Sequence, residues 1–155
     1  MSNRPLPSAL PLLTSALALA LSIAACGGDE QRAAPTAQIP LTHQWNVPAG
    51  ASLFTKNSLG AEPTAAGDVM MQAMPNVVYR LGERCKGDPA FAKVGALTIE
   101  AVIDNAAAQD IAVLPQSSGA DCIRGAVAEE VAKEKEALSG APPAKILLHL
   151  EHTPG

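Results

Sequence analysis

The sequence contains few aromatic residues, and its charge balance is mildly acidic. Aromatic residues make up 3% of the 155 residues, with one Trp, one Tyr and two Phe. The hydrophobic core must therefore consist of Val, Leu, Ile, Ala and Met, which argues against a site that holds flat ligands by stacking. Lys and Arg number 11 against 15 Asp and Glu, so the formal net charge is −4. This balance argues against nucleic acid as a partner.

The common catalytic and cofactor-binding motifs are also missing. The sequence has no HExxH, no Gly-x-Ser-x-Gly and no Gly-rich phosphate loop. His149 and His152 lie three residues apart, a spacing that turns them to opposite faces of a strand and suits no metal site. Neither Cys85 nor Cys122 has a histidine near it in sequence. We therefore expect no enzyme, no metal and no cofactor, and a small enzyme stays the weaker alternative.

One long apolar run is present, and it lies at the N-terminus. A polar start with Arg4 leads into apolar residues 9–21 and then into the mostly small residues 22–25. This layout is typical of a secretory signal peptide, and a retained membrane-spanning helix is the alternative. Pro11 and Thr14 interrupt the run, which is short of the roughly 20 apolar residues that a span prefers. Removal of residues 1–25 takes away one positive charge and changes the formal net charge from −4 to −5.

The end of this run resembles a lipobox, the cleavage motif of bacterial lipoproteins. Its residues are Ile23-Ala24-Ala25-Cys26. Small residues let a peptidase reach the bond before Cys26, and the Cys26 thiolate can be alkylated by a diacylglyceryl donor. The resemblance implies fatty-acyl chains such as palmitate on Cys26, each worth about 0.8 kcal/mol per buried methylene in membrane binding. The alternative is an ordinary signal peptide with a chance cysteine.

The residue after this cysteine bears on the membrane to which the chain is attached. In lipoproteins of double-membraned bacteria, an aspartate at this position commonly signals inner-membrane retention. Here the position is Gly27. The resemblance therefore implies lipid attachment to the outer membrane, with the protein facing the periplasm.

The remaining chain divides into a tether and one folded domain. Residues 26–65 contain scattered Gly and Pro with little periodicity, which predicts a flexible tether. Apolar residues at three- and four-residue steps predict a helix over 66–86, kinked or restarted at Pro75. We assign residues 66–153 to the domain.

The second half of the domain alternates between strand and helix patterns. Alternating apolar residues predict a hairpin of strands at 97–103 and 109–114, and a last strand at 145–151. A capping box at Ser118 and Asp121 predicts a second helix that ends near residue 138. Its charged run of residues 129–136 is expected to form a solvated face. The elements together predict an α+β fold.

This order of elements resembles the TonB-like C-terminal domain family, especially the variant in gliding-motility proteins of the AgmX/PglI type. Cys85, Gly95, Cys122 and Pro142 match its pattern, and the resemblance covers about residues 75 to 151. It implies a small antiparallel sheet with both helices packed on one face. Two departures are an Ala106 where the family usually has a turn Gly, and a missing aromatic-Pro element after the second helix. The inner-membrane helix and Pro-rich rod of energy transducers are missing too, so that activity is not carried over.

The resemblance also implies a disulfide between Cys85 and Cys122. The two helices that carry them pack on the same face of the sheet in that family, which brings these helix ends together. Lipid on Cys26 leaves these two cysteines as an even pair in an oxidising compartment. The alternative is two separately buried thiols.

The expected role is non-catalytic binding of an envelope protein by a domain held on a membrane. Strand addition to a sheet edge is the mode that the TonB-like resemblance suggests, and the last strand, with outward Leu147, is one candidate edge. The partner-binding residues are not identified by sequence. The alternatives are a structural envelope lipoprotein without a dedicated ligand, and a small periplasmic enzyme. An exposed, unpaired strand with few charges favours binding, whereas a fully covered sheet favours the structural role.

Overall fold

The computed structural model of this chain describes residues 38–152. The expected signal peptide (residues 1–25) and the expected lipidation residue Cys26 lie outside these residues. Among the helices within 38–152, none combines the length and the apolar character needed to cross a bilayer.

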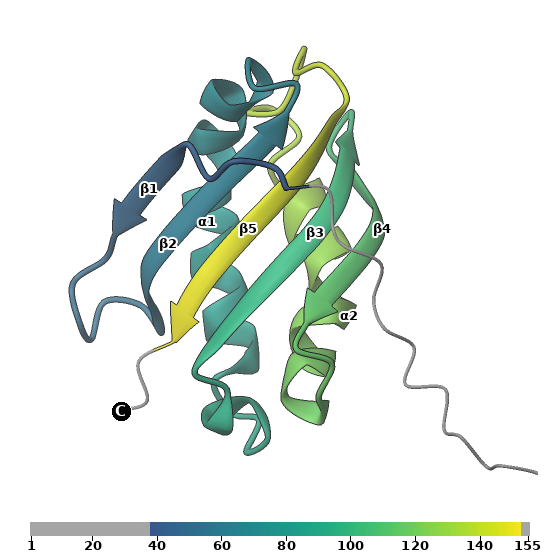
Figure 1. Cartoon of the computed structure of the whole chain (residues 1–155). Coiled ribbons are helices and arrows are strands. Elements are labelled where there is room, and N and C mark those ends of the chain that lie inside the picture. The colour runs from purple at the N-terminus through teal and green to yellow at the C-terminus, as the bar shows by residue number, and fades with distance from the viewer. Residues whose placement is uncertain (1–37, 153–155) are drawn as a thin grey trace, which may run out of the picture. The chain divides into compact units, whose positions relative to one another are not determined.

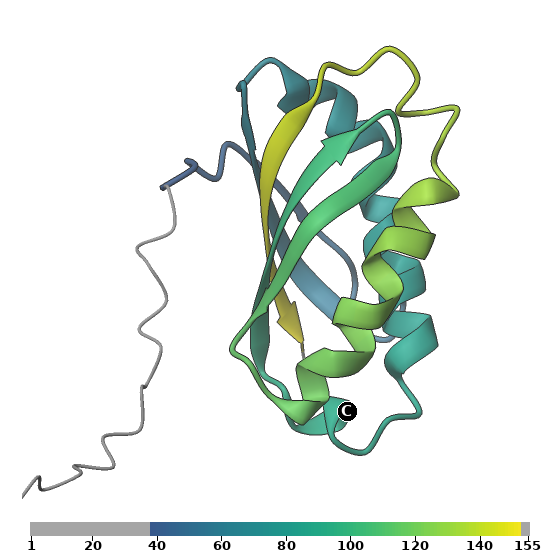
Figure 2. The same ribbon diagram turned by 90° about the vertical axis from the view of Figure 1, so that its right-hand side faces the viewer.

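The described residues form one antiparallel sheet with two helices on one of its faces (Figures 1 and 2). The strands lie in the order β1-β2-β5-β3-β4. The strand bounds are β1 His43–Asn46, β2 Phe54–Glu62, β3 Ala96–Asp104, β4 Ala107–Leu114 and β5 Ala144–His152. The helix bounds are α1 Ala66–Cys85 and α2 Ser118–Ala132, with a short 3₁₀ helix at Phe91–Lys93. The predicted α+β fold, with helices packed on one face of an antiparallel sheet, is confirmed.

Most of the predicted elements are present with small shifts at their ends. Helix α1 runs without a break through Pro75, and β3 pairs with β4 as the predicted hairpin. Helix α2 begins one residue earlier than expected, because Ser117 is the N-cap and its Oγ accepts from Ala120 N–H at 3.3 Å. It ends at Ala132, so the prediction that it continues to about residue 138 is wrong. Residues 133–140 form turns instead, in which Glu134 N–H donates to Val131 O three residues back.

The prediction of a tether over residues 26–65 is wrong for its second half, which forms β1 and β2. The sequence of β2 does not show a regular alternation of apolar and polar residues, because a β-bulge between Phe54 and Lys56 shifts the register. Asn57, a residue type depleted in strands, is nevertheless buried in this one. With its amide oriented by its neighbours, the Asn57 side-chain oxygen accepts from Trp45 Nε1 at 3.2 Å, which ties β1 to β2.

The last strand is not an edge of the sheet. Strand β5 lies between β2 and β3 and pairs with both along its length. The expectation of an open edge at Leu147 is therefore wrong, and a proline there would disrupt a central strand. The two edges are β1 and β4.

The core fills the layer between the helices and the sheet. Alternate residues of β5 point into it, and these are Ile146, Leu148 and Leu150. Three rings close the end of this layer at which β5 finishes: His152 stacks on Phe91 with ring centroids 5.0 Å apart, and Phe54 meets both edge-on. Nδ1 of His152 donates to Val94 O at 2.6 Å, so His152 is a packed structural residue.

The helices are joined by the predicted disulfide. Cys85, the last residue of α1, is bonded to Cys122 in the first turns of α2, with an S–S distance of 2.05 Å. The bond connects positions 37 residues apart in sequence. The pairing that the family resemblance implied is therefore present in the structure.

A buried carboxylate also connects the helices. Glu130 is 2% exposed and accepts from Arg80 Nε and from Lys133 Nζ, each at 2.8 Å, with Arg84 at 3.3 Å. Burial opposes the charge of Glu130, but the hydrogen bonds from Lys133, Arg80 and Arg84 outweigh it and lower its pKa. The expectation of a wholly solvated charge run over 129–136 is therefore wrong at this residue.

Candidate functional site

Strand β4 is the longer of the two sheet edges. It has eight residues and pairs with β3 on one side, and within residues 38–152 no strand lies on its other side. Asp110 is its one charged residue, and Ala107, Gln109 and Ala112 are also exposed. An edge strand of this kind presents backbone N–H and C=O groups that a second chain can pair with.

The β4 edge is divided by a bulge. The register with β3 shifts between Glu100 and Val102, and Asp110 has a positive φ of 50°. An extra residue here bends and twists the strand, which is one way in which natural sheets limit uncontrolled edge pairing. The edge therefore offers two short pairing segments, 107–109 and 111–114.

Both ends of β4 are set by the local sequence. The hairpin turn has Asn105 and Ala106 at φ of 47° and 62°, the backbone region of a type I′ turn. Pro115 follows the strand and has no N–H to donate. The part of β4 with which a partner strand can pair is therefore limited by the turn at one end and by Pro115 at the other.

Strand β1 is a poorer edge because it is short and held by its own side chains. It has four residues. The His43 ring lies so close to Gly67 of α1 that a Cβ at Gly67 would come within 2.5 Å of it. Nε2 of His43 donates to Asp68 Oδ1 at 3.0 Å, while Thr42 Oγ1 donates to its other ring nitrogen at 2.9 Å. These contacts fix β1 against the helix.

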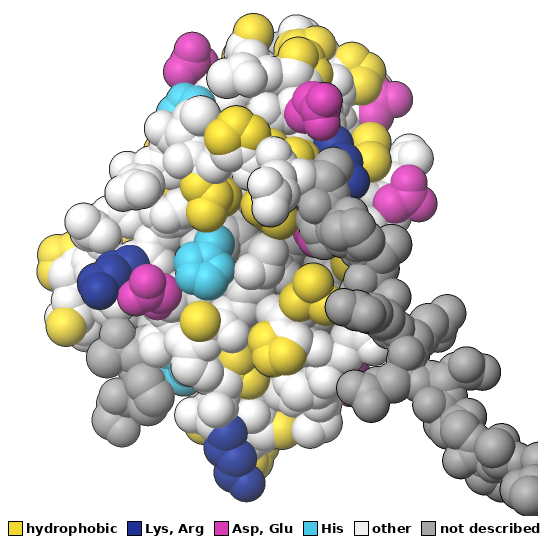
Figure 3. All heavy atoms as spheres, viewed as in Figure 1, with side chains coloured by type: hydrophobic (Ala, Val, Ile, Leu, Met, Phe, Trp, Pro, Cys, Tyr) yellow, Lys and Arg dark blue, Asp and Glu magenta, His cyan; other side chains and the backbone are white. Residues whose placement is uncertain are grey.

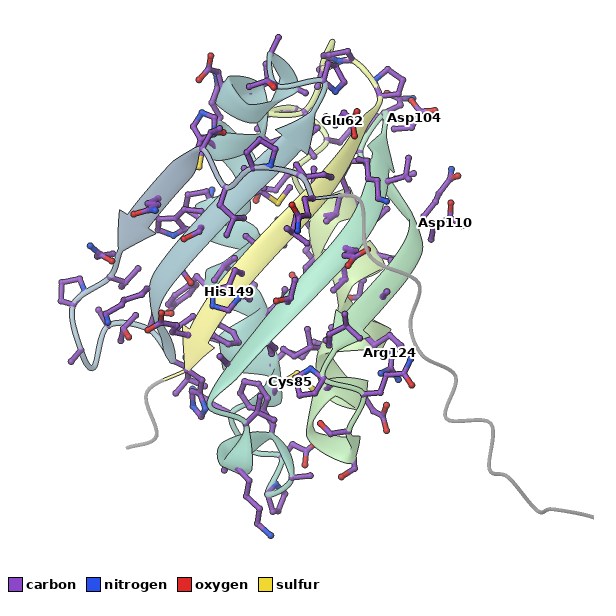
Figure 4. All side chains as sticks on the ribbon, in the orientation of Figure 1. Glu62, Cys85, Asp104, Asp110, Arg124 and His149 are labelled. Atoms are coloured by element: carbon purple, nitrogen blue, oxygen red, sulfur yellow. A yellow bond between two sulfur atoms is a disulfide. The ribbon has the colours of Figure 1, made fainter. Side chains whose placement is uncertain are left out.

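The face of the sheet away from the helices, called the open face below, carries the outward side chains of β2, β5, β3 and β4. One row across it is Ser58, His149, Thr98 and Leu114, and the next is Gly60, Leu147, Glu100 and Ala112. Nδ1 of His149 lies 3.1 Å from Thr98 Oγ1 near the centre of this face (Figure 4). Hydrophobic, histidine and neutral polar side chains dominate the centre, and most charged ones lie toward the margins (Figure 3).

Residues 38–41, called the strap below, cross the open face in front of β2 and β5 (Figure 1). Ile39 of the strap is 5% exposed. The close approach requires Gly60, because a Cβ there would lie 2.5 Å from Pro40 O and 2.9 Å from Ile39 Cγ2. Thr42 N–H then donates to Leu59 O at 3.1 Å and leads the chain into β1.

The structure brings together some of the residues that the sequence singled out and separates others. Cys85 and Cys122 meet, whereas His149 and His152 point to opposite faces, as their spacing predicted. Within residues 38–152, no three His, Cys, Asp or Glu side chains are grouped so as to hold a metal ion. Sequence reasoning did not find the strap or the β4 edge. The glycine at position 60 is the one local signal of the strap, and nothing local marks β4 as an edge.

Comparisons of the chain with known protein families, with curated proteins and with solved structures found no match.

Proposed function

We propose that this protein is a lipoprotein of the outer membrane, attached through lipid on Cys26, whose periplasmic domain binds a partner protein without catalysis. The partner adds a strand to the β4 edge. The lipobox-like residues before Cys26 support the lipid attachment. The Cys85–Cys122 disulfide supports export, because such bonds persist in oxidising compartments and are rare in the cytosol.

The observation that carries the binding proposal is the β4 edge itself. Strand addition obtains its affinity from backbone hydrogen bonds, so it needs an unpaired strand and no deep pocket. It also needs few like charges on that strand, and β4 has one charged residue in eight. Specificity then comes from alternate side chains of the added strand. Side chains of the added strand that point toward the helical layer meet α2 near Arg124. Arg124 and Asp110 lie on the same side of the molecule (Figure 4).

A structural envelope lipoprotein without a dedicated ligand is the nearest alternative. A sheet covered on both faces and at both edges would favour it. Here, within the described residues, the helices cover one face and β4 is paired on one side only. Both features favour a binding role.

The edge is tested by proline substitutions at adjacent positions. Consecutive residues of an edge strand point their N–H groups alternately toward the neighbouring strand and outward. Of Ala107→Pro and Ala108→Pro, one therefore breaks the β3–β4 ladder and the other removes only an outward donor. Thermal unfolding identifies the folded variant of the two. Photo-crosslinking in intact cells, followed by mass spectrometry, should then find a partner with the wild type and lose it with that folded variant. Unchanged crosslinking would refute strand addition at this edge.

The lipid attachment is tested separately by Cys26→Ser. The variant should move to the aqueous phase in detergent phase separation, while the wild type stays with the detergent. Equal partitioning of both proteins would show that Cys26 is not the site of attachment.

A further inference from the structure

We propose that the open face of the sheet is the surface that faces the lipid bilayer, and that the short connection to Cys26 holds it there. The inference rests on the proposed lipid attachment, and it identifies which side of the domain is turned toward the membrane. It leaves the helical layer and the β4 edge accessible from the periplasm.

The position of the strap is the first observation. The strap lies on the side of the sheet opposite to the helices (Figure 2). It is seated there by the contact of Ile39 and Pro40 with Gly60, and Ile39 is buried in that contact. The chain that leads back toward Cys26 therefore starts from the open face, at Gln38.

The length of that connection is the second observation. Cys26 and Gln38 are 12 residues apart, so their Cα atoms lie at most about 43 Å from each other. A domain of 115 residues has a radius of gyration of about 13 Å, which corresponds to a sphere about 34 Å across. If the helices faced the bilayer, the open face and Gln38 would point away from it. The connection would then run around a quarter of the circumference of the sphere to its side and descend one radius to the membrane, about 44 Å in all. That path requires every residue to be fully extended, whereas the opposite orientation requires only a fraction of the length.

The side chains of the open face suit this position. Lys56 and Glu151 form a pair at 3.4 Å, and Lys145 lies opposite Glu62 in the register. In both places a basic side chain has an acidic neighbour, whereas Glu100 on this face lies beside Leu147 and Ala112 in the register, so the charges of the open face give no net attraction to anionic headgroups. Between them lie apolar residues, which are Val102, Leu114 and Leu147, and Leu41 of the strap is 38% exposed. The short connection, rather than an attraction of charges, keeps this face at the membrane.

The orientation is tested with a photo-crosslinking amino acid in the full-length chain, in isolated membranes. Ala96 and Ala112 are exposed on the open face, and Ala128 is an equally small, exposed residue of α2. Lipid adducts should form at Ala96 and Ala112 at least about fivefold more often than at Ala128, because the tether raises the local lipid concentration on one side. Equal yields at the three positions, an excess at Ala128, or open-face adducts to protein alone would overturn the proposal.

A second variant tests the role of the connection. Insertion of about twelve Gly and Ser residues after Gly28 roughly doubles its length and should bring the adduct ratio close to one. An unchanged ratio would show that the connection does not set the orientation. Phase separation on the same samples distinguishes the two proposals. If the wild type fails to partition with detergent, the lipid attachment fails, whereas partitioning with an unbiased adduct pattern refutes the orientation alone.

Discussion

The two faces of the sheet are built on different principles. The face under the helices is fixed by burial, by the Cys85–Cys122 disulfide and by the carboxylate of Glu130 between two helices. The open face carries half-buried side chains such as Thr98, Leu147 and His149, and the strap packs closely on it at Gly60. Stability is thus concentrated on one side, which leaves the side chains of the other free to suit a membrane or a partner.

The same comparison distinguishes the two edges of the sheet. Strand β1 is connected to the helical side through the His43 ring at Gly67 and Asp68. Strand β4 packs on α2 with alternate side chains, but its outer backbone edge takes no part in the core. An edge can therefore bind a second chain without loss of the interactions that fold the domain.

Removal of the disulfide is expected to have the largest effect on the covered side. The double variant Cys85→Ala, Cys122→Ala should lose about 4 kcal/mol of unfolding free energy, because the bond closes a loop of 37 residues in the unfolded chain. Chemical denaturation of both proteins measures the difference. Reduced wild-type protein is the control and should unfold at the same denaturant concentration as the variant. A loss of less than about 1 kcal/mol would mean that the bond contributes little to folding.

Two neighbouring leucines test the comparison of the faces directly. Leu148 is 2% exposed under the helices, and Leu147 is half-buried on the open face of the same strand. Leu148→Ala should cost about 3 kcal/mol through lost burial and a new cavity. Leu147→Ala should cost less than about 1 kcal/mol. Equal losses in denaturation experiments would mean that the open face is as closely packed as the covered one.

The elements that could be predicted from the sequence are those whose burial follows a regular period. Helix α1, the β3–β4 hairpin and β5 each bury one side of a continuous pattern, so composition and spacing were enough. Strand β2 was missed because its bulge and the buried Asn57 break the alternation. Sheet order depends on which strands pair across the chain, and no local pattern records it. For this reason the sequence placed the open edge at β5 rather than at β4.

The buried charge of Glu130 should make part of the stability of the covered side depend on pH. Its pKa is lowered in the folded state, so its contribution is present above the unfolded value of about 4.3 and is lost as the pH falls through the folded value. Glu130→Gln should cost about 1–2 kcal/mol at pH 7, and the difference from wild type should shrink below about pH 4. Denaturation at several pH values measures it, with the exposed Glu136→Gln as the control. A difference that stays constant down to pH 2 would contradict this origin.

The smallest expected effect concerns the turn that connects the two strands at the β4 edge. Ala106 has a φ of 62°, a region that costs an L-residue about 1–2 kcal/mol and that glycine occupies freely. Glycine also loses more chain entropy on folding and gives up the contacts of a side chain that is 6% exposed. The cost of the positive φ at alanine exceeds the combined cost of the added chain entropy and the lost contacts. Ala106→Gly should therefore stabilise the protein by about 0.5 kcal/mol.

Ala108→Gly is the matched control, since Ala108 lies two residues further along in regular strand conformation, where the same change should destabilise by about 0.5–1 kcal/mol. Opposite signs for the two variants in thermal unfolding would locate strain in the turn. The same sign for both would mean that the turn is relaxed with alanine. In that case the hairpin, and with it the β4 edge, is held in place by the packing of α2 on the covered side and not by the turn.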